Sequence, residues 1–297
     1  MSPAAEATRS GFVAVAGRPN VGKSTLVNAI VAGKVAIVSD KPQTTRRAIR
    51  GVATGPDWQL VLVDLPGVQR PRDALTERMQ RSVEHELAES DAAVLVIDGT
   101  QAVGPGDRFI AARLGESQGP VVIAVNKVDR LDRAATAAAL EAASDLSPDA
   151  EVFPVSARTG AGVRALVEHL VGRLGPGPFY FPPDQRSDLP EEVEIAELVR
   201  EQVLSRTRQE VPHAVEVSVD EIGRRPGLVT VRAYVWVETE SQKGILIGAG
   251  GRMVRAVGTA ARRELERRLG ARVHLDLSVR VRRHWRADDA LLDRLGI

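Results

Sequence analysis

The chain has 297 residues, 43% of them hydrophobic and 27% charged, which is ordinary for a globular protein and excludes wholesale disorder. Its length suggests two domains, because domains commonly have about 100–200 residues. Its formal net charge is +1 and it has no cysteine, so the composition indicates no polyanion partner for the whole molecule and excludes disulfides, thiolate metal sites and cysteine nucleophiles.

Short apolar runs alternate with helix-length segments in the first part of the chain. The runs are rich in valine and mostly lack polar alternation, as strands covered on both faces do; they span 11–16, 59–64, 92–98, 120–125 and 151–155. Between them the spacing predicts helices over 23–33, 73–89, 106–115, 131–144 and 161–174. This alternation predicts an α/β domain with a mainly parallel sheet over residues 1–175.

The segment GRPNVGKS at residues 17–24 matches the phosphate-binding pattern G-x-x-x-x-G-K-[ST], between the first strand and the first helix. Loop amides at a helix N-terminus have no helical partner and carry the positive end of the dipole, so they bind phosphates. Lys23 adds a charge and Ser24 offers a hydroxyl to Mg²⁺. The predicted contacts are Gly17, Arg18, Pro19, Asn20, Val21, Gly22, Lys23, Ser24 and Thr25.

The segment DLPG at residues 64–67 follows the second strand, at the sheet edge where ligands of open α/β folds bind. There Asp64 can hold magnesium through water, and Gly67 permits close approach to the γ-phosphate. A simple turn is the alternative interpretation. The predicted contacts are Asp64, Leu65, Pro66, Gly67 and Val68.

The segment NKVD at residues 126–129 indicates which base the bound nucleotide carries. Asp129 can accept hydrogen bonds from N1–H and the exocyclic amine of guanine, donors that adenine does not offer together, so GTP and GDP are predicted instead of ATP. We expect Asn126 to brace the neighbouring loops and the stem of Lys127 to lie over the base. With the SAR loop after the next strand, the predicted contacts are Asn126, Lys127, Val128, Asp129, Ser156, Ala157 and Arg158.

A segment rich in proline and glycine separates the two halves of the chain, and we assign residues 176–190 as a linker because it can continue neither a helix nor a central strand. Over residues 191–297 the pattern changes to an α-β-β-α-α-β order. The spacing there predicts a helix over 191–208, strands over 213–222 and 228–238, a short helix before a glycine loop, a helix over 251–269 and a strand over 272–282.

The segment SQKGILIGAGG at residues 241–251 places a G-x-x-G loop between two helices. In this element order it is typical of an α+β type II KH domain, whose loop clamps about four nucleotides of single-stranded RNA. Residues 248–297 hold 12 Arg against 6 Asp plus Glu, which favours that interpretation over a ligand-free turn between helices. Ile245, Ile247 and Val254 are expected to line a groove for bases.

The predicted RNA contacts include Trp285, for which simple packing is the alternative to stacking on a base. The full set is Lys243, Gly244, Gly248, Ala249, Gly250, Gly251, Arg252, Arg255, Arg280, Arg282, Arg283 and Trp285.

These motifs, together with KPQTTR at residues 41–46 and RRHW at 282–285, resemble the Era family of GTPases over nearly the whole chain. The resemblance implies hydrolysis of GTP to GDP and phosphate, binding to the 3′ end of small-subunit ribosomal RNA, and a role in maturation of the small ribosomal subunit. It implies that Thr45, with Thr44 as the alternative, completes a magnesium site with Ser24 and Asp64. Lys23, Thr45 and Gly67 then form the catalytic set.

Three features qualify the resemblance. Val68 stands where Ras-like proteins have a water-orienting glutamine, so we expect slow turnover that an outside factor raises. Asn20 resembles an asparagine that holds K⁺ in similar GTPases, with bracing of its own loop as the alternative. Ala249 replaces the usual loop lysine and so removes a charge from that phosphate contact; Arg252 and Arg255 are candidates to compensate.

Two other functions stay open at this point: a GTP-loaded switch whose C-terminal domain binds a protein or membrane partner, and an RNA-binding module that seldom hydrolyses GTP. No apolar run reaches the roughly 20 residues that span a bilayer, and the first residues lack a signal-peptide pattern. We therefore expect a cytoplasmic protein, and separately we expect a monomer; the family resemblance adds peripheral association with the inner face of the cytoplasmic membrane.

Overall fold

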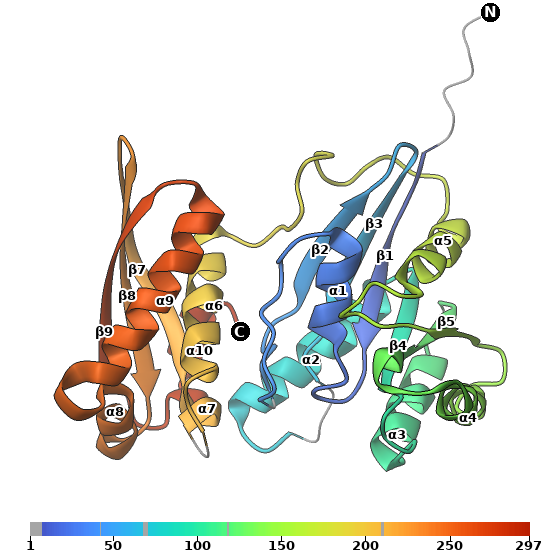
Figure 1. Ribbon diagram of the computed structural model, residues 1–297, viewed down its shortest axis with the longest axis horizontal. Helices are drawn as coiled ribbons and strands as arrows, with labels where there is room; N and C mark the ends of the chain where they lie inside the picture. The colour runs from blue at the N-terminus through green and yellow to red at the C-terminus, as the bar shows by residue number, and fades with distance from the viewer. Residues whose placement is uncertain (1–7, 42, 68–70, 118, 209–210) are drawn as a thin grey trace, which may run out of the picture. The chain divides into compact units, whose positions relative to one another are not determined.

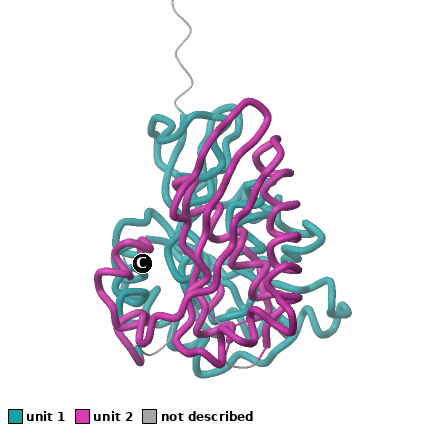
Figure 2. The backbone as a smooth tube through the Cα atoms, turned by 90° about the vertical axis from the view of Figure 1, so that its left-hand side faces the viewer, with its two compact units in different colours: residues 1–36, 45–71, 76–188 teal, residues 37–44, 72–75, 189–297 magenta. Residues whose placement is uncertain are grey.

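The structure is a computed structural model that describes residues 8–41, 43–67, 71–117, 119–208 and 211–297 (Figure 1). The chain divides into two compact units, coloured separately in Figure 2. The first unit comprises Met1–Ala36, Thr45–Pro71 and Thr76–Asp188. The second comprises Ile37–Thr44, Arg72–Leu75 and Leu189–Ile297.

A six-stranded sheet in the order β2-β3-β1-β4-β5-β6 forms the centre of the first unit. All neighbouring pairs are parallel except β2 and β3, so the expectation of a mainly parallel sheet is confirmed. The five strands predicted from valine-rich runs are all present. The strands are β1 (Arg9–Ala16), β2 (Ile49–Thr54), β3 (Trp58–Asp64), β4 (Ala92–Asp98), β5 (Val121–Asn126) and β6 (Glu151–Pro154).

Helices cover both faces of this sheet, which is why its central strands lack polar alternation. Residues of α1 and α5 pack in one hydrophobic cluster, and residues of α2, α3 and α4 pack in another on the opposite face (Figure 1). The helices are α1 (Lys23–Val31), α2 (Ala74–Glu89), α3 (Pro105–Gly115), α4 (Arg133–Ser144) and α5 (Val163–Arg173), with a 3₁₀ turn, η1, at Val128–Arg130.

Strand β2 was not predicted. It is an edge strand, antiparallel to β3, and it has only one neighbouring strand to define it. Gly51 at its centre lies against helix α1, where an added Cβ would lie 2.8 Å from Cγ1 of Val27. The glycine that permits this packing also weakens the strand pattern in the sequence.

The segment assigned as a linker lies against the first unit in the structure. The buried side chain of Gln59 accepts hydrogen bonds from the amides of Tyr180 and Phe181 at 2.7 and 2.9 Å. The amide of Val52 donates to the carbonyl oxygen of Arg186 at 2.9 Å. Residues as far as 188 therefore belong to the first unit, although their composition excludes regular structure.

The second unit is an α+β fold on a three-stranded sheet in the order β7-β8-β9, with β7–β8 antiparallel and β8–β9 parallel. The predicted α-β-β-α-α-β order is present in it. Alternate residues of β8 are buried and face α6 and α9. The elements are α6 (Glu191–Leu204), α7 (Val211–Ala214), β7 (Glu216–Arg225), β8 (Leu228–Val237), α8 (Glu240–Ile247), η2 (Ala249–Gly251), α9 (Arg252–Leu269), β9 (Arg272–Val281), η3 (Trp285–Ala287) and α10 (Asp289–Leu295).

A buried ion cluster lies inside the second unit. Arg200 on α6 is fully buried and donates to Oε2 of Glu197 at 2.7 Å, with Oε1 of Glu216 at 3.5 Å from its Nε. It also donates to the carbonyl oxygen of Thr44. Among the described residues, no helix combines the length and apolar character needed to cross a bilayer.

Candidate nucleotide and RNA sites

The phosphate loop lies between β1 and α1, and its glycines are required by close neighbours. A Cβ at Gly17 would lie 2.4 Å from the carbonyl oxygen of Val96, and one at Gly22 would lie 2.3 Å from Nδ2 of Asn126. Both glycines also have positive φ, which side chains disfavour. The loop can therefore pass close to the sheet edge just before α1 begins.

Lys23 is buried within this loop. Its Nζ donates to the carbonyl oxygens of Gly17 and Arg18, both at 3.1 Å. Burial lowers the pKa of Lys23 to about 8, against the opposing attraction of Asp64. A desolvated ammonium of this kind gains most from a multiply charged anion, which the phosphates of a nucleotide supply.

Three oxygen-bearing side chains meet beside Lys23. Ser24 donates to Oδ2 of Asp64 at 2.6 Å, and its Oγ lies 3.1 Å from Oγ1 of Thr45. Oδ1 of Asp64 is buried and has no hydrogen-bond partner in the described part of the chain. Desolvation raises the pKa of Asp64 to about 6, while Lys23 and the two hydroxyls oppose the shift.

This donor set fits Mg²⁺, a hard cation that prefers carboxylate and hydroxyl oxygens. An orphaned buried carboxylate oxygen is what such a cation would satisfy. The alternative ligand Thr44 is used differently, because its hydroxyl donates to the carbonyl oxygen of Lys41 at 2.6 Å. The geometry therefore favours Thr45 with Ser24 and Asp64.

The base-recognition loop is braced by Asn126, as the sequence predicts. Its Nδ2 donates to the carbonyl oxygen of Val21 at 2.9 Å, and its Oδ1 accepts from the amides of Lys127 and Ala157 at 2.8 and 3.0 Å. One amide side chain thus joins the phosphate loop, the NKVD loop and the SAR loop.

Asp129 is oriented by the SAR loop. Ser156 Oγ donates to Oδ1 of Asp129 at 2.6 Å, and Arg158 Nη2 donates to Oδ2 at 2.6 Å. The hydrogen bond from Ser156 is the largest cause that lowers the pKa of Asp129. The carboxylate is therefore ionised at neutral pH and can accept the two donors of guanine.

The remaining predicted nucleotide contacts lie in the same loops. An added Cβ at Gly67 would lie 2.9 Å from Cγ of Pro19, so the DLPG turn touches the phosphate loop. Val68 lies outside the described residues, and its role stays a prediction. The other members are Arg18, Asn20, Val21, Thr25, Leu65, Pro66, Val128 and Ala157.

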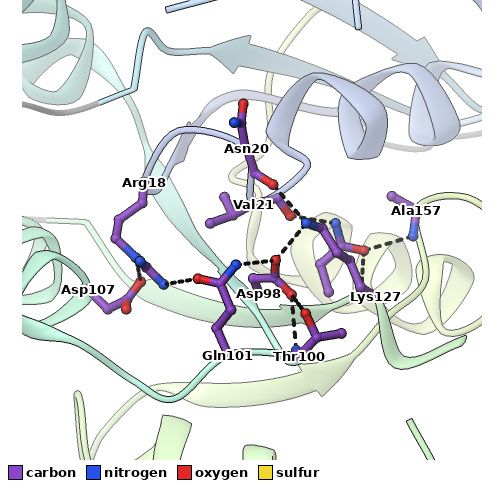
Figure 3. Close-up of polar contacts among 10 residues, drawn as sticks. Arg18, Asn20, Val21, Asp98, Thr100, Gln101, Asp107, Lys127 and Ala157 are labelled. Atoms are coloured by element: carbon purple, nitrogen blue, oxygen red, sulfur yellow. Dashed lines mark hydrogen bonds and ion pairs between the residues drawn. The ribbon is translucent and has the colours of Figure 1, made fainter. Parts of the chain in front are cut away.

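Two buried carboxylates near the loop were missed by sequence reasoning. Asp98 ends β4 and Asp107 lies in the first turn of α3; each is at most 3% exposed. Asp98 accepts from Lys127, and Asp107 accepts from Arg18 (Figure 3). The available signal was position, because Asp98 ends a buried strand as Asp64 and Asn126 do, and the ends of parallel strands meet at one edge.

The second glycine loop differs from the first in its surroundings. Gly248, Gly250 and Gly251 all have positive φ, whereas Ala249 does not. A Cβ at Gly250 would meet nothing within 4 Å, so this turn is open to ligand. Lys243 and Gly244 on α8 precede the loop, and Arg252 and Arg255 begin α9 as exposed side chains. The Arg255 guanidinium donates to the carbonyl oxygen of Gly250.

A groove of about 490 Å³ lies beside α9. Helix α9 contributes Val254, Arg255, Gly258, Thr259 and Arg262, and the edge strand β9 contributes His274, Leu275, Asp276 and Leu277. Val254 was predicted to line such a groove. Ile245 and Ile247 are not among these lining residues, and Ile245 is half exposed on α8. The groove thus opens between α9 and β9 and not along α8.

The four predicted contacts near the C-terminus are dispersed. Arg280 stacks on Tyr234, with its guanidinium carbon 3.8 Å from the ring centroid, and Arg282 pairs with Asp288. Arg283 lines a separate pocket with His284. The prediction that Trp285 contacts RNA is wrong for this structure.

Trp285 is completely buried, and its Nε1 donates to the carbonyl oxygen of Ala214 at 2.9 Å. Its ring has no free face for a base, so packing, the alternative considered from the sequence, describes this residue.

This arrangement of phosphate loop, DLPG turn and NKVD loop at one sheet edge defines a guanine-nucleotide-binding P-loop GTPase, joined here to a KH unit. A family model described as 50S ribosome-binding GTPase matches residues 12–127, and one described as KH domain matches residues 210–286. GTPase Era of Mycobacterium sp. strain KMS is 46% identical over 294 residues, covering 97% of this chain and 98% of that protein. The chain belongs to the GTPase Era family.

Other comparisons agree. GTPase Era of Mycobacterium tuberculosis strain H37Ra is 47% identical over 295 residues, covering 97% of this chain and 98% of that protein. A crystal structure of Era in complex with MgGDPNP and nucleotides 1506–1542 of 16S ribosomal RNA has a TM-score of 0.94 at 34% identity, covering 97% and 99% of the two chains. A point variant of Aquifex aeolicus Era bound to GDP.AlF4- has the same TM-score at 33% identity and the same coverage.

Proposed function

We propose that this GTPase hydrolyses GTP in the first unit, binds the 3′ end of small-subunit ribosomal RNA through the second, and acts in maturation of the small ribosomal subunit. The observation that carries the proposal is the likeness over 97% of the chain to an Era structure that holds both MgGDPNP and 16S ribosomal RNA. Both glycine loops that would meet those ligands are present here.

For hydrolysis, the proposal assigns charge neutralisation to Lys23 and the loop amides, because phosphoryl transfer depends on positioning and electrostatics more than on covalent help. Ser24, Thr45 and Asp64 would hold Mg²⁺, which supplies further positive charge to the phosphates when bound. Gly67 allows the DLPG turn to approach the γ-phosphate. Asp129 selects guanine, and Asn126 fixes its loop.

For RNA binding, the proposal assigns the nucleotide backbone to the 248–251 loop and unstacked bases to the groove between α9 and β9. Arg252 and Arg255 supply positive charge beside the loop in place of the lysine that Ala249 replaces. The exposed turn at Gly250 supports this assignment, because a Cβ added there would meet no heavy atom within 4 Å.

Two experiments test the proposal. Multiple-turnover phosphate release from GTP should accelerate when small ribosomal subunits are added; an unaltered rate would refute the assembly role. A short single-stranded RNA from the 16S 3′ end should bind with salt-dependent affinity, and the Gly248→Asp/Gly251→Asp variant should lose it. If the wild-type chain binds no RNA but binds a protein or lipid partner, the second unit has the alternative function.

The proposal also includes K⁺ held near Asn20 as a source of added charge, which predicts faster hydrolysis in K⁺ than in Na⁺. It places the chain in the cytoplasm as a monomer, with a peripheral fraction at the inner face of the cytoplasmic membrane. Equal rates in the two salts would remove the K⁺ site. Sedimentation and cell fractionation test the remaining two statements.

A further inference from the structure

Asp98 is a buried carboxylate with every acceptor position in use. Its Oδ1 accepts from the amide and the hydroxyl of Thr100 at 3.0 and 2.6 Å, and its Oδ2 accepts from Gln101 Nε2 at 3.1 Å. Oδ2 also accepts from Nζ of Lys127 at 2.6 Å. Three of these donors are neutral, and the two from Thr100 share Oδ1 and would donate equally well to a single amide oxygen there. Only the ammonium of Lys127 specifically requires a negative charge at this position.

Lys127 connects the base loop with the phosphate loop. Besides its contact with Asp98, its Nζ donates to the carbonyl oxygen of Asn20 at 2.8 Å (Figure 3). Both Lys127 and Asn20 have positive φ, 69° and 64°, a conformation that residues other than glycine rarely adopt. Such backbone persists only where surrounding contacts determine it, and the bridge through Nζ is a contact of that kind.

The loop that carries Asp98 also reaches the outer side of the phosphate loop. Gln101 Oε1 accepts from Nη2 of Arg18 at 3.4 Å, and buried Asp107 accepts from Nε of Arg18 at 2.8 Å. The stem of Arg18 lies against Gly106, where an added Cβ would be 2.8 Å from Cδ. The phosphate loop is thus held from the β4–α3 side at both Arg18 and Asn20.

We propose that Asp98 is a positioning residue for guanine-nucleotide binding, whose carboxylate holds the Lys127 ammonium against the Asn20 carbonyl oxygen and so ties the base loop to the phosphate loop. This inference rests on the proposed function, because it concerns the affinity of the same nucleotide site. Asp98 lies behind Lys127 and acts through it.

The proposal separates binding from chemistry. Lys127 is part of the base loop, and this link reaches the phosphate loop at the carbonyl oxygen of Asn20 and not at Lys23 or at the Mg²⁺ ligands Ser24, Thr45 and Asp64. Loss of the link should therefore weaken the binding of GDP and of GTP to the same extent. It should leave the rate of hydrolysis at saturating GTP unchanged. A carboxylate that only shaped its own turn would change stability without this selective loss of affinity.

The test is the release rate of a fluorescent N-methylanthraniloyl-GDP from full-length wild-type chain and from Asp98→Asn. The variant keeps an oxygen for both donors of Thr100, but its amide nitrogen replaces Oδ2 and so removes the charge that holds Lys127 and the acceptor of Gln101. We expect release to accelerate by about 10-fold, because a hydrogen bond between ionised groups is roughly twice as strong as a neutral one. The kcat for GTP should stay within about twofold, since a change confined to KM reports uniform binding.

A double-mutant cycle shows whether the effect passes through Lys127. In a Lys127→Met background, Asp98→Asn should raise the release rate of the GDP analogue by less than about twofold, because the two substitutions remove the same interaction. Thr100→Val is the matched control: it removes a different donor to the same carboxylate and should leave release near the wild-type rate. Asp98→Glu, which keeps the charge but displaces it, should give an intermediate rate and serves as the second variant if melting curves show Asp98→Asn unfolded.

Release from Asp98→Asn or Asp98→Glu at the wild-type rate would overturn the proposal. So would equal acceleration by Thr100→Val, or full additivity with Lys127→Met, because either places the effect in the turn and not in the ammonium. A wild-type chain that fails to bind the GDP analogue would instead overturn the proposed GTPase function itself.

Discussion

Removing the charge of Asp64 should stabilise the nucleotide-free chain while it disables the enzyme. Asp64 is fully buried, and its pKa is raised to about 6 from an ordinary value of 3.8, chiefly by desolvation. The folded chain therefore binds more protons than the unfolded chain between about pH 4 and pH 6, and stability falls as pH rises through that window. Asp64→Asn imitates the protonated form at every pH.

The size of the effect follows from the shift. A change of about 2 pKa units corresponds to about 3 kcal/mol at pH 7. The side-chain amide of the variant brings a buried N–H donor for which the site offers no acceptor. This unsatisfied donor lowers the stability by about 1 kcal/mol. We therefore expect a net gain of about 2 kcal/mol, or about 4–8 °C in melting temperature for a unit of this size.

Thermal melts in chelator without nucleotide measure this gain. The gain should be largest at pH 7 and above and shrink to roughly a third at pH 5, where wild-type Asp64 is mostly protonated. Asp98→Asn is the matched control. Hydrogen bonds from Lys127 and Thr100 lower the pKa of Asp98 despite its burial, so this variant should lose stability at pH 7. An Asp64→Asn chain that melts below wild type at pH 7, or whose gain is independent of pH, would refute the reasoning.

Three further outcomes are expected. Asp129→Asn should weaken the binding of GTP by more than about 100-fold and favour the binding of xanthosine triphosphate, because the new amide can donate to the oxygen that xanthine carries in place of the guanine amine. Competition between the two nucleotides measures this change. Arg200→Met should lower the unfolding free energy of the second unit by about 3 kcal/mol in denaturant titration, since it removes the buried positive charge that offsets the carboxylates of Glu197 and Glu216; no change would contradict the ion cluster. Gly22→Ala should abolish GDP binding in calorimetry, because its Cβ would lie 2.3 Å from Nδ2 of Asn126.

The sequence predicted a residue's role correctly where that role follows from its side-chain type and its position next to a recognisable strand or helix. Asn126 illustrates this, since a polar side chain directly after a buried apolar strand must lie at the sheet edge. Strands β1, β3, β4, β5 and β6 were predictable because each has an apolar run between turn signals. Strand β2 was not, because it has only one neighbouring strand and a central glycine.

The missed and mistaken residues depend on tertiary contacts that spacing does not contain. Asp98 looks like an ordinary turn residue until Lys127, 29 positions away, is placed against it. Trp285 follows three consecutive polar or basic residues, and nothing local indicates that its ring is buried against the carbonyl oxygen of Ala214. Between Thr44 and Thr45 the residue types are identical, so only the positions of Ser24 and Asp64 could distinguish them.

The two glycine loops illustrate different physical requirements for the same residue. In the phosphate loop, Gly17 and Gly22 are needed because neighbouring atoms fill the space a Cβ would take. In the 248–251 loop, Gly250 has open space around it, and glycine is needed there for its positive φ and for the approach of a ligand. Ala249, the one member of that turn without positive φ, is where a side chain is tolerated. A loss of affinity on substitution of Gly250 would therefore report backbone strain or lost contact with ligand, whereas one at Gly22 would also report altered packing against Asn126.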